Sequence, residues 1–198
     1  MSKLPPLLLV HGLGDTARVF KSMTAYLTER GWPVFSCDLK PSNGQLPLEV
    51  LAQQLDRYIQ AHLPTAEPFD LLGFSMGGII SRYYLQRLGG LERVRRFLAI
   101  SSPHRGTWTG YLRWNPGCEQ MRPDSEFLRD LNQDWQVLEQ VNVVSLWTPF
   151  DLMIVPADSS VIPVGRSLAF PVALHPWMLT DDRVFATIVK LLTEPDPS

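Results

Sequence analysis

Short apolar runs alternate with amphipathic stretches along this chain of 198 residues, and this alternation is the feature that most constrains its fold. The apolar runs predict strands at residues 7–10, 34–37, 69–72, 97–100, 141–147 and 168–173. Apolar residues that recur at three- and four-residue spacing predict helices at residues 17–30, 48–62 and 76–88. Strands that alternate with helices favour an α/β fold, with a mostly parallel central sheet and helices on both faces.

The length and the 45% content of hydrophobic residues suit a single domain spanning residues 1–198. Residues 103–140 interrupt the alternation, because they mix aromatic and polar residues over a stretch too long for a simple connection. Within them, Asp124 or Ser125 can cap a helix. The apolar side of that helix would consist of Phe127, Leu128, Leu131, Trp135 and Leu138. We therefore expect a small cap over one end of the sheet, and a tail at residues 194–198 that frays.

The charge balance excludes some classes of partner. A net charge of -2 and a pI near 6.1 provide no basic field that would attract nucleic acid. No stretch approaches the roughly 18 apolar residues of a membrane span. The apolar run at residues 7–10 is short and lacks a signal-peptide cleavage site. These features predict a cytoplasmic protein without a transmembrane segment.

The two cysteines carry no metal-binding pattern. Cys37 and Cys118 form no CxxC motif and have no histidine nearby at metal-ligand spacing. We expect both to be reduced thiols, and we expect neither a metal ion nor a cofactor.

The segment Gly73-Phe74-Ser75-Met76-Gly77 matches the pattern G-x-S-x-G between a predicted strand and a predicted helix. A serine at a sharp strand-to-helix turn has strained backbone angles, and glycines beside it let neighbouring chain approach closely. The turn exposes the hydroxyl at a helix N-terminus, where developing negative charge is favoured. The pattern predicts Ser75 as a nucleophile; the alternative is a structural glycine-rich turn.

A serine hydroxyl needs a base to become a strong nucleophile. Of the four histidines, His11 lies in a loop that follows the first strand, and we expect it to shape that loop. His62, at the end of a predicted helix, should face solvent. His104 could line the site but precedes any plausible acid. His175 comes last in the chain, as the order serine, acid, histidine requires, and is the predicted base.

The base needs an acid that orients it. Asp151 follows a predicted strand, so it lies at the same edge of the sheet as Ser75, and it is the predicted acid. Asp158 is the second candidate, although a solvated loop position suits it better. Asp38 and Asp70 precede the serine, which favours structural roles. A further aspartate, Asp15, could brace the loop after the first strand through hydrogen bonds to the backbone.

The transition state of acyl transfer carries an oxyanion that fixed backbone N–H groups stabilise. The residue after the nucleophile supplies one such donor, which here is Met76. The segment His11-Gly12-Leu13-Gly14 is of the type that supplies the second, and Leu13 is the expected donor. The chemistry requires no metal.

Several ordered motifs resemble those of bacterial lipases of the α/β-hydrolase superfamily, especially lipase class 2 enzymes related to triacylglycerol lipases. The resemblance rests on the segments at residues 11–14, 73–78, 102–107, 120–128 and 151–156 and on His175. It implies the α/β-hydrolase fold, a triad of Ser75, Asp151 and His175, and an oxyanion hole at Leu13 and Met76. This chain departs from the family at Leu174, where glycine is common, and in its longer segment at residues 103–140.

Taken together, these features predict a serine hydrolase that cleaves carboxylic esters through an acyl-enzyme, with an acyl ester or a lipid as substrate and with transient contact to a lipid interface. Two alternatives stay open. A thioesterase or an acyltransferase would use the same triad, and a non-catalytic binding protein could keep the same fold.

Overall fold

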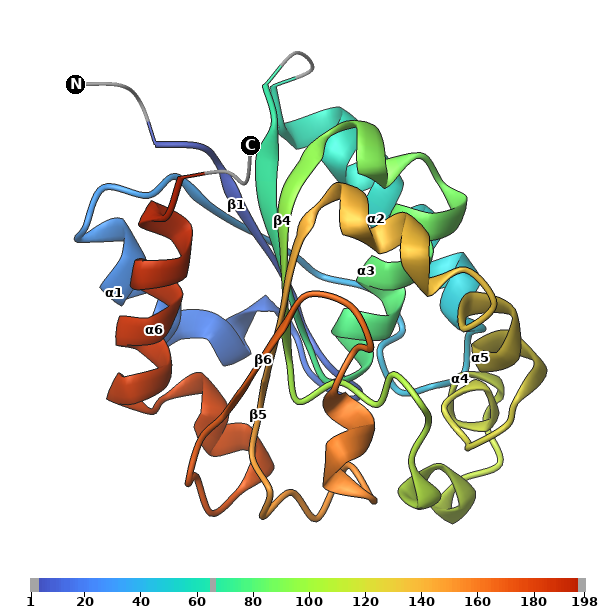
Figure 1. Cartoon of the computed structure of the whole chain (residues 1–198). Helices are drawn as coiled ribbons and strands as arrows, with labels where there is room; N and C mark the ends of the chain where they lie inside the picture. Colours follow the sequence, from blue (N-terminus) through green and yellow to red (C-terminus); the bar gives the residue numbers. More distant parts are fainter. Residues whose placement is uncertain (1–3, 65–66, 196–198) are drawn as a thin grey trace.

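The computed structural model describes residues 4–64 and 67–195 and contains a six-stranded sheet between two layers of helices (Figure 1). The strands are β1 (Leu7–Val10), β2 (Val34–Cys37), β3 (Phe69–Phe74), β4 (Val94–Ile100), β5 (Asn142–Trp147) and β6 (Arg166–Ala169). Their order across the sheet is β2-β1-β3-β4-β5-β6, and every neighbouring pair is parallel. The carboxyl ends of all six strands therefore meet at one edge of the sheet.

Helices α1 (Lys21–Thr28) and α6 (Asp182–Thr193) cover one face of the sheet, and α2 (Leu48–His62) and α3 (Met76–Arg87) cover the other (Figure 1). Successive side chains of a strand point to opposite faces, so a strand between two helical layers must be apolar at every position. Strand β1 shows this arrangement. Leu7 and Leu9 pack into the core beside α1 and α6, whereas Leu8 and Val10 pack into the core beside α2 and α3. The expected α/β fold with a central parallel sheet is confirmed.

Strand β3 ends later and strand β4 begins earlier than predicted, and three elements near the ends of the sheet differ more. The expected helix at residues 17–30 begins with a 3₁₀ turn, η1 (Ala17–Phe20), because Thr16 and Asp38 accept hydrogen bonds from its first backbone N–H groups. Strand β6 begins and ends earlier than expected, since Pro171 has no N–H with which to continue the ladder. Helix α6 is not among the predicted elements.

The segment at residues 103–140 consists of short helices on the α2 and α3 side of the sheet (Figure 1). These are η3 (Trp108–Leu112), α4 (Pro116–Gln120), α5 (Glu126–Leu131) and η4 (Trp135–Gln140). Ser125 caps α5, as expected for one of the two candidates, and its hydroxyl accepts a hydrogen bond of 3.2 Å from Leu128 N. We call this segment the cap.

The single helix expected after residue 124 is wrong, because the chain breaks between α5 and η4. The carbonyl of Leu131 would bond to the N–H four residues later if the helix continued. Instead it accepts hydrogen bonds from Arg82 Nη2 at 2.7 Å and from Gln86 Nε2 at 2.8 Å. The Arg82 guanidinium also lies over the ring of Trp135, 3.8 Å from its centre. These contacts fasten the second half of the cap to α3.

Of the tail expected at residues 194–198, residues 196–198 lie outside the described part of the chain. Glu194 is held, since its carboxylate pairs with Arg166 at 2.5 Å and its carbonyl accepts a hydrogen bond from Arg96. Within residues 4–64 and 67–195, no helix combines the length and the apolar composition that a membrane crossing requires.

Candidate active site

Ser75 lies at the turn between β3 and α3 with φ 54° and ψ −125°, a left-handed conformation that is rare for a residue with a side chain. Neighbouring backbone approaches this turn so closely that a side chain would not fit on its glycines. A Cβ on Gly73 would lie 2.5 Å from the Cα of Gly78, and a Cβ on Gly77 would clash with the carbonyl of Val10. The turn thus has the geometry expected of the G-x-S-x-G motif.

His175 begins η6 (His175–Leu179), and its Nδ1 lies 2.7 Å from Asp151 Oδ2. The other carboxylate oxygen of Asp151 accepts hydrogen bonds of 2.9 Å from the backbone N–H groups of Met153 and Ile154. Burial opposes the charge of Asp151, but His175 and these two N–H groups outweigh it and hold the pKa of the carboxyl below its ordinary value. Asp151 is therefore ionised at neutral pH, which favours a proton on Nδ1 of His175 and leaves Nε2 free to accept.

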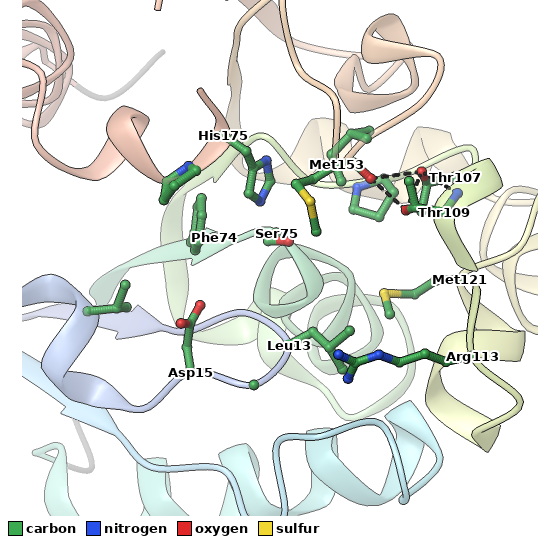
Figure 2. A pocket seen from close by; sticks show the side chains of 15 residues that line it. Leu13, Asp15, Phe74, Ser75, Thr107, Thr109, Arg113, Met121, Met153 and His175 are labelled. Atoms are coloured by element: carbon green, nitrogen blue, oxygen red, sulfur yellow. Dashed lines mark hydrogen bonds between the residues drawn. The ribbon is translucent and has the colours of Figure 1, made fainter. Parts of the chain in front are cut away.

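Ser75 and His175 line the same pocket, whose volume is about 330 Å³ (Figure 2). The imidazole stands over Ser75 and is packed against the ring of Phe74, with 4.7 Å between the ring centres. Ser75 is half-buried, whereas His175 and Asp151 are buried. The structure therefore brings together all three residues of the predicted triad, although they are distant in the chain.

The loop after β1 passes beside Ser75. A Cβ on Gly12 would lie 3.0 Å from the Cβ of Ser75. His11 shapes this loop as expected, since its Nδ1 lies 3.0 Å from the carbonyl of Gly12 and its Nε2 accepts a hydrogen bond of 3.0 Å from Leu39 N. The next turn is held by Gly14 N, which donates to Ser42 O at 2.8 Å.

Leu13 lines the pocket from this loop, and no described residue accepts a hydrogen bond from its N–H. Met76 follows Ser75 as the first residue of α3, where a backbone N–H has no partner within the helix. Both residues are thus adjacent to the nucleophile with N–H groups available. Their role as oxyanion donors stays a prediction.

The remaining two histidines do not line the pocket around Ser75. His104, expected as a possible pocket residue, is fully buried beside Phe97 and does not line the pocket. Burial and the nearby Arg82 charge hold the pKa of His104 well below its ordinary value, so it stays neutral. His62 is exposed and stacks on Tyr58.

The other aspartates considered from the sequence have structural partners. Asp158 is exposed and pairs with Arg105 at 2.9 Å. Asp38 accepts a hydrogen bond of 2.7 Å from the backbone of η1, and Asp70 pairs with Arg95 at 3.0 Å on the core side of β3. These positions agree with the roles expected for them.

The bracing role expected for Asp15 is wrong. Its carboxylate accepts no hydrogen bond from the residues that the structure describes, and it lines the pocket instead (Figure 2). Burial raises the pKa of the Asp15 carboxyl above its ordinary value, and His11 and His175 oppose this rise only in part. The loop is held by other contacts instead, since Gly14 N donates to Ser42 O, Asp15 N donates to Gly12 O, and the His11 side chain accepts from Leu39 N.

Five residues of the cap line the pocket, and the three polar ones among them were not expected site residues. Thr107 and Thr109 donate hydrogen bonds from their hydroxyls to the carbonyl of Met153, at 3.0 and 2.7 Å, and so connect the cap to the loop after Asp151 (Figure 2). Arg113 extends into the pocket from the end of η3. Their sequence contains no strong signal, because their proximity to Ser75 depends on how the cap folds back.

Both cysteines are buried free thiols, and burial raises the pKa of Cys37 to about 12. Among residues 4–64 and 67–195 there is no group of three or more histidine, cysteine or carboxylate side chains placed to hold a metal ion. Neither cysteine lines the pocket.

Comparisons with known proteins fit this arrangement. A family model described as palmitoyl protein thioesterase matches residues 6–133. The lysosomal thioesterase PPT2 of Mus musculus is 29% identical over 115 residues, which cover 55% of this chain and 38% of that protein. The lysosomal thioesterase PPT2 of Homo sapiens is 30% identical over 117 residues, with the same coverage. The chain thus spans less than two fifths of the length of these relatives.

Solved lipase structures share the fold. Aspergillus fumigatus lipase B superposes with a TM-score of 0.83 at 18% identity, over 98% of this chain and 53% of that one. The mature form of Bacillus licheniformis lipase BlEst2 superposes with a TM-score of 0.80 at 16% identity, over 98% and 94% of the two chains. These likenesses show the α/β-hydrolase fold, and the family match covers more than half of the chain. The protein therefore belongs to the palmitoyl protein thioesterase family.

Proposed function

We propose that this protein hydrolyses carboxylic esters with Ser75 as nucleophile, His175 as general base and Asp151 as the orienting acid. The observation that carries the proposal is the 2.7 Å contact between His175 Nδ1 and Asp151 Oδ2 in the same pocket wall as Ser75. A serine held at positive φ, beside a histidine whose other nitrogen bonds to a buried carboxylate, is suited to nucleophilic attack on an acyl carbon.

The reaction would proceed in two steps. Ser75 Oγ attacks the ester carbonyl while Nε2 of His175 takes the hydroxyl proton, and the N–H groups of Leu13 and Met76 stabilise the oxyanion. When the carbon–oxygen bond breaks, the imidazolium returns the proton to the departing alcohol and leaves an acyl-serine. Water then attacks the acyl-serine with the same base, which releases the acid and restores Ser75.

Thioester hydrolysis is the second candidate, because the matching family model and the curated relatives are described as thioesterases. The same residues would act, and a thiol would replace the alcohol as leaving group. Transfer of the acyl group to an alcohol is a further outcome of this chemistry. It would appear as a new ester among the products when a competing alcohol is added.

Two substrates with the same acyl chain and different leaving groups distinguish ester hydrolysis from thioester hydrolysis. We expect purified protein to hydrolyse both p-nitrophenyl octanoate and the octanoyl thioester of pantetheine, with the higher kcat/KM identifying the preferred bond. A series of p-nitrophenyl esters from acetate to palmitate would give the acyl length. Folded protein that hydrolyses neither substrate, and that no fluorophosphonate modifies at Ser75, would contradict the proposal and favour a binding role.

Nine large apolar side chains among the described residues are exposed, and all come from segments that follow β4, β5 and β6. They are Trp108, Tyr111, Leu112, Trp114, Phe150, Leu152, Met153, Leu174 and Trp177. Eight of them line the pocket or lie within two residues of one that does. We call this set the apolar rim. An exposed apolar surface around a pocket supports an acyl or lipid substrate and transient contact with a lipid interface.

Two acidic substitutions in the apolar rim test this contact. Leu112 and Trp114 are 80% and 79% exposed, so aspartate at both positions should leave the fold intact. We expect the double variant to lose about tenfold or more in binding to phosphatidylcholine vesicles, because two apolar groups can no longer leave water. Co-sedimentation with the vesicles measures this.

The matched control places two aspartates at Ser22 and Gln53, which are both exposed and do not line the pocket. It should sediment with vesicles as the wild type does. Equal sedimentation of wild type and the Leu112→Asp/Trp114→Asp variant would rule out the apolar rim as the contact surface.

We also propose that residues 1–198 form one catalytic domain to which the cap belongs. The cap is hydrogen-bonded to α3 through Arg82 and to the loop after β5 through Thr107. The cytoplasmic location stays a prediction, since the curated relatives are named as lysosomal proteins.

A further inference from the structure

The pocket around Ser75 is mainly apolar, yet two charged side chains other than the base line it. Asp15 comes from the loop after β1, and Arg113 comes from the cap at the end of η3. Figure 2 shows them on opposite sides of Ser75, with the guanidinium reaching inward beside Leu13 and Met121. A pocket for a purely apolar acyl ester needs neither charge.

The guanidinium of Arg113 has no ion-pair or hydrogen-bond partner within the described part of the chain. No carboxylate pairs with it, and no carbonyl accepts a hydrogen bond from it. Its neighbours differ in this respect. Arg105 pairs with Asp158, and Arg122 pairs with Glu119 at 3.4 Å while lying over the rings of Tyr111 and Trp114. Arg113 is thus a cation at the pocket whose five donors remain available.

The backbone of Arg113 is fixed, which gives the side chain a defined starting point. Its carbonyl accepts a hydrogen bond of 3.1 Å from Arg122 Nη2, and Arg122 Nε holds the carbonyl of Gly110 at 3.2 Å. The residue adopts extended backbone angles, φ −138° and ψ 144°, as η3 ends. Arg122 therefore determines where the chain leaves η3 and from which side Arg113 enters the pocket.

Asp15 and Arg113 give the two sides of the pocket side chains of opposite charge. Its half-buried carboxylate receives no hydrogen bond from the described residues, so an anionic group of a substrate would meet a like charge there. On the side of Arg113, an anionic group would meet a planar donor that binds carboxylate and phosphate oxygens in pairs.

We propose that Arg113 binds an anionic group, a carboxylate or a phosphate, of the acyl substrate while the scissile carbonyl lies at Ser75. This inference rests on the proposed acyl hydrolysis and specifies its substrate class. The anionic group can belong to the acyl chain, as in the half-ester of a dicarboxylic acid, or to the leaving group, as in a thioester of a phosphorylated thiol. In either position, Arg113 orients the substrate in the pocket by its charge.

Two pairs of substrates distinguish these sources. In the first pair, mono-p-nitrophenyl suberate carries a carboxylate at the end of the acyl chain that p-nitrophenyl octanoate lacks. In the second pair, the octanoyl thioester of phosphopantetheine carries a phosphate that the thioester of pantetheine lacks. The measured quantity is the ratio of kcat/KM for the anionic substrate to that for its neutral partner.

We expect Arg113→Ala to lower this ratio about tenfold in one of the two pairs, mainly through KM, because the contact exists before and during the reaction. Arg113→Glu should lower it further, and added salt should weaken the preference of the wild type. The pair that responds identifies the source of the anionic group. Arg129→Ala is the matched control, since this exposed arginine of α5 does not line the pocket.

Ratios that Arg113→Glu leaves unchanged in both pairs would overturn the inference while the proposed function stands, provided that the neutral substrates are hydrolysed and that Ser75→Ala abolishes this. Absence of any Ser75-dependent hydrolysis would instead overturn the proposed function and the inference with it. Circular dichroism of each variant shows whether a change in ratio accompanies a change in fold.

Discussion

Ser75→Ala is expected to lower kcat/KM for p-nitrophenyl octanoate by about 10³-fold or more, because no other hydroxyl can form the acyl intermediate in this pocket position. The fold should persist, since alanine is smaller than serine and the turn is held by backbone contacts such as Ser75 N to Ile100 O at 2.9 Å. Initial rates of p-nitrophenol release measure the loss, and mass spectrometry of fluorophosphonate-treated protein shows whether the adduct disappears with it.

The control for this variant is Ser22→Ala, an exposed serine of α1. It should keep wild-type rates and a wild-type adduct. If Ser75→Ala retains the adduct or more than a few per cent of the activity, Ser75 is not the nucleophile, and the turn at residues 73–77 is then only structural.

Asp151→Asn is expected to lower kcat by about 10⁴-fold with little change in the fold. The asparagine oxygen can keep the hydrogen bonds from Met153 N and Ile154 N, both 2.9 Å in the structure. Its amide nitrogen would then face Nδ1 of His175, where two N–H groups cannot meet. The imidazole proton moves to Nε2, so the ring no longer accepts a proton from the serine. Steady-state rates at neutral pH measure this loss.

Asp158→Asn is the matched comparison, because Asp158 is the other aspartate in the same loop region and its ion pair with Arg105 is exposed. Exposed pairs contribute little, so rates and stability should stay near those of the wild type. A large loss of activity in Asp158→Asn with normal rates in Asp151→Asn would reverse the assignment of the acid.

Local sequence patterns predicted the centre of the fold well. Strand β1, strand β2 and helix α2 have the bounds expected from their apolar runs and spacing. Strand β1 and the apolar face of α2 are buried, whereas β2 lies at the edge of the sheet and is mostly half-buried. Helix α6 shows the limit of that approach. Asp181 caps it, and apolar residues recur at helical spacing, so the signal exists in the sequence although the helix was not predicted.

The cap shows which features of the structure local sequence patterns do not predict. Its expected single helix breaks because Arg82 and Gln86, about 45 residues earlier, take the carbonyl of Leu131. Local sequence likewise does not show that Arg113 and Asp15 line the pocket. Motif spacing indicated Ser75, Asp151 and His175, since the α/β-hydrolase fold places a serine, an acid and a histidine in that chain order. Pocket residues without such an order depend on tertiary contacts.

The residues of the candidate site lie in two parts of the chain, and the family match covers only one of them. Residues 6–133, which the family model matches, contain the nucleophile, the loop of Leu13 and most of the cap. Asp151 and His175 follow β5 and β6, beyond that region. Likeness to the family therefore extends to the part of the site that contains Ser75 and Leu13. The family match does not reach Asp151 or His175, so a substitution at either residue could end the proposed hydrolysis while the match to residues 6–133 stays unchanged.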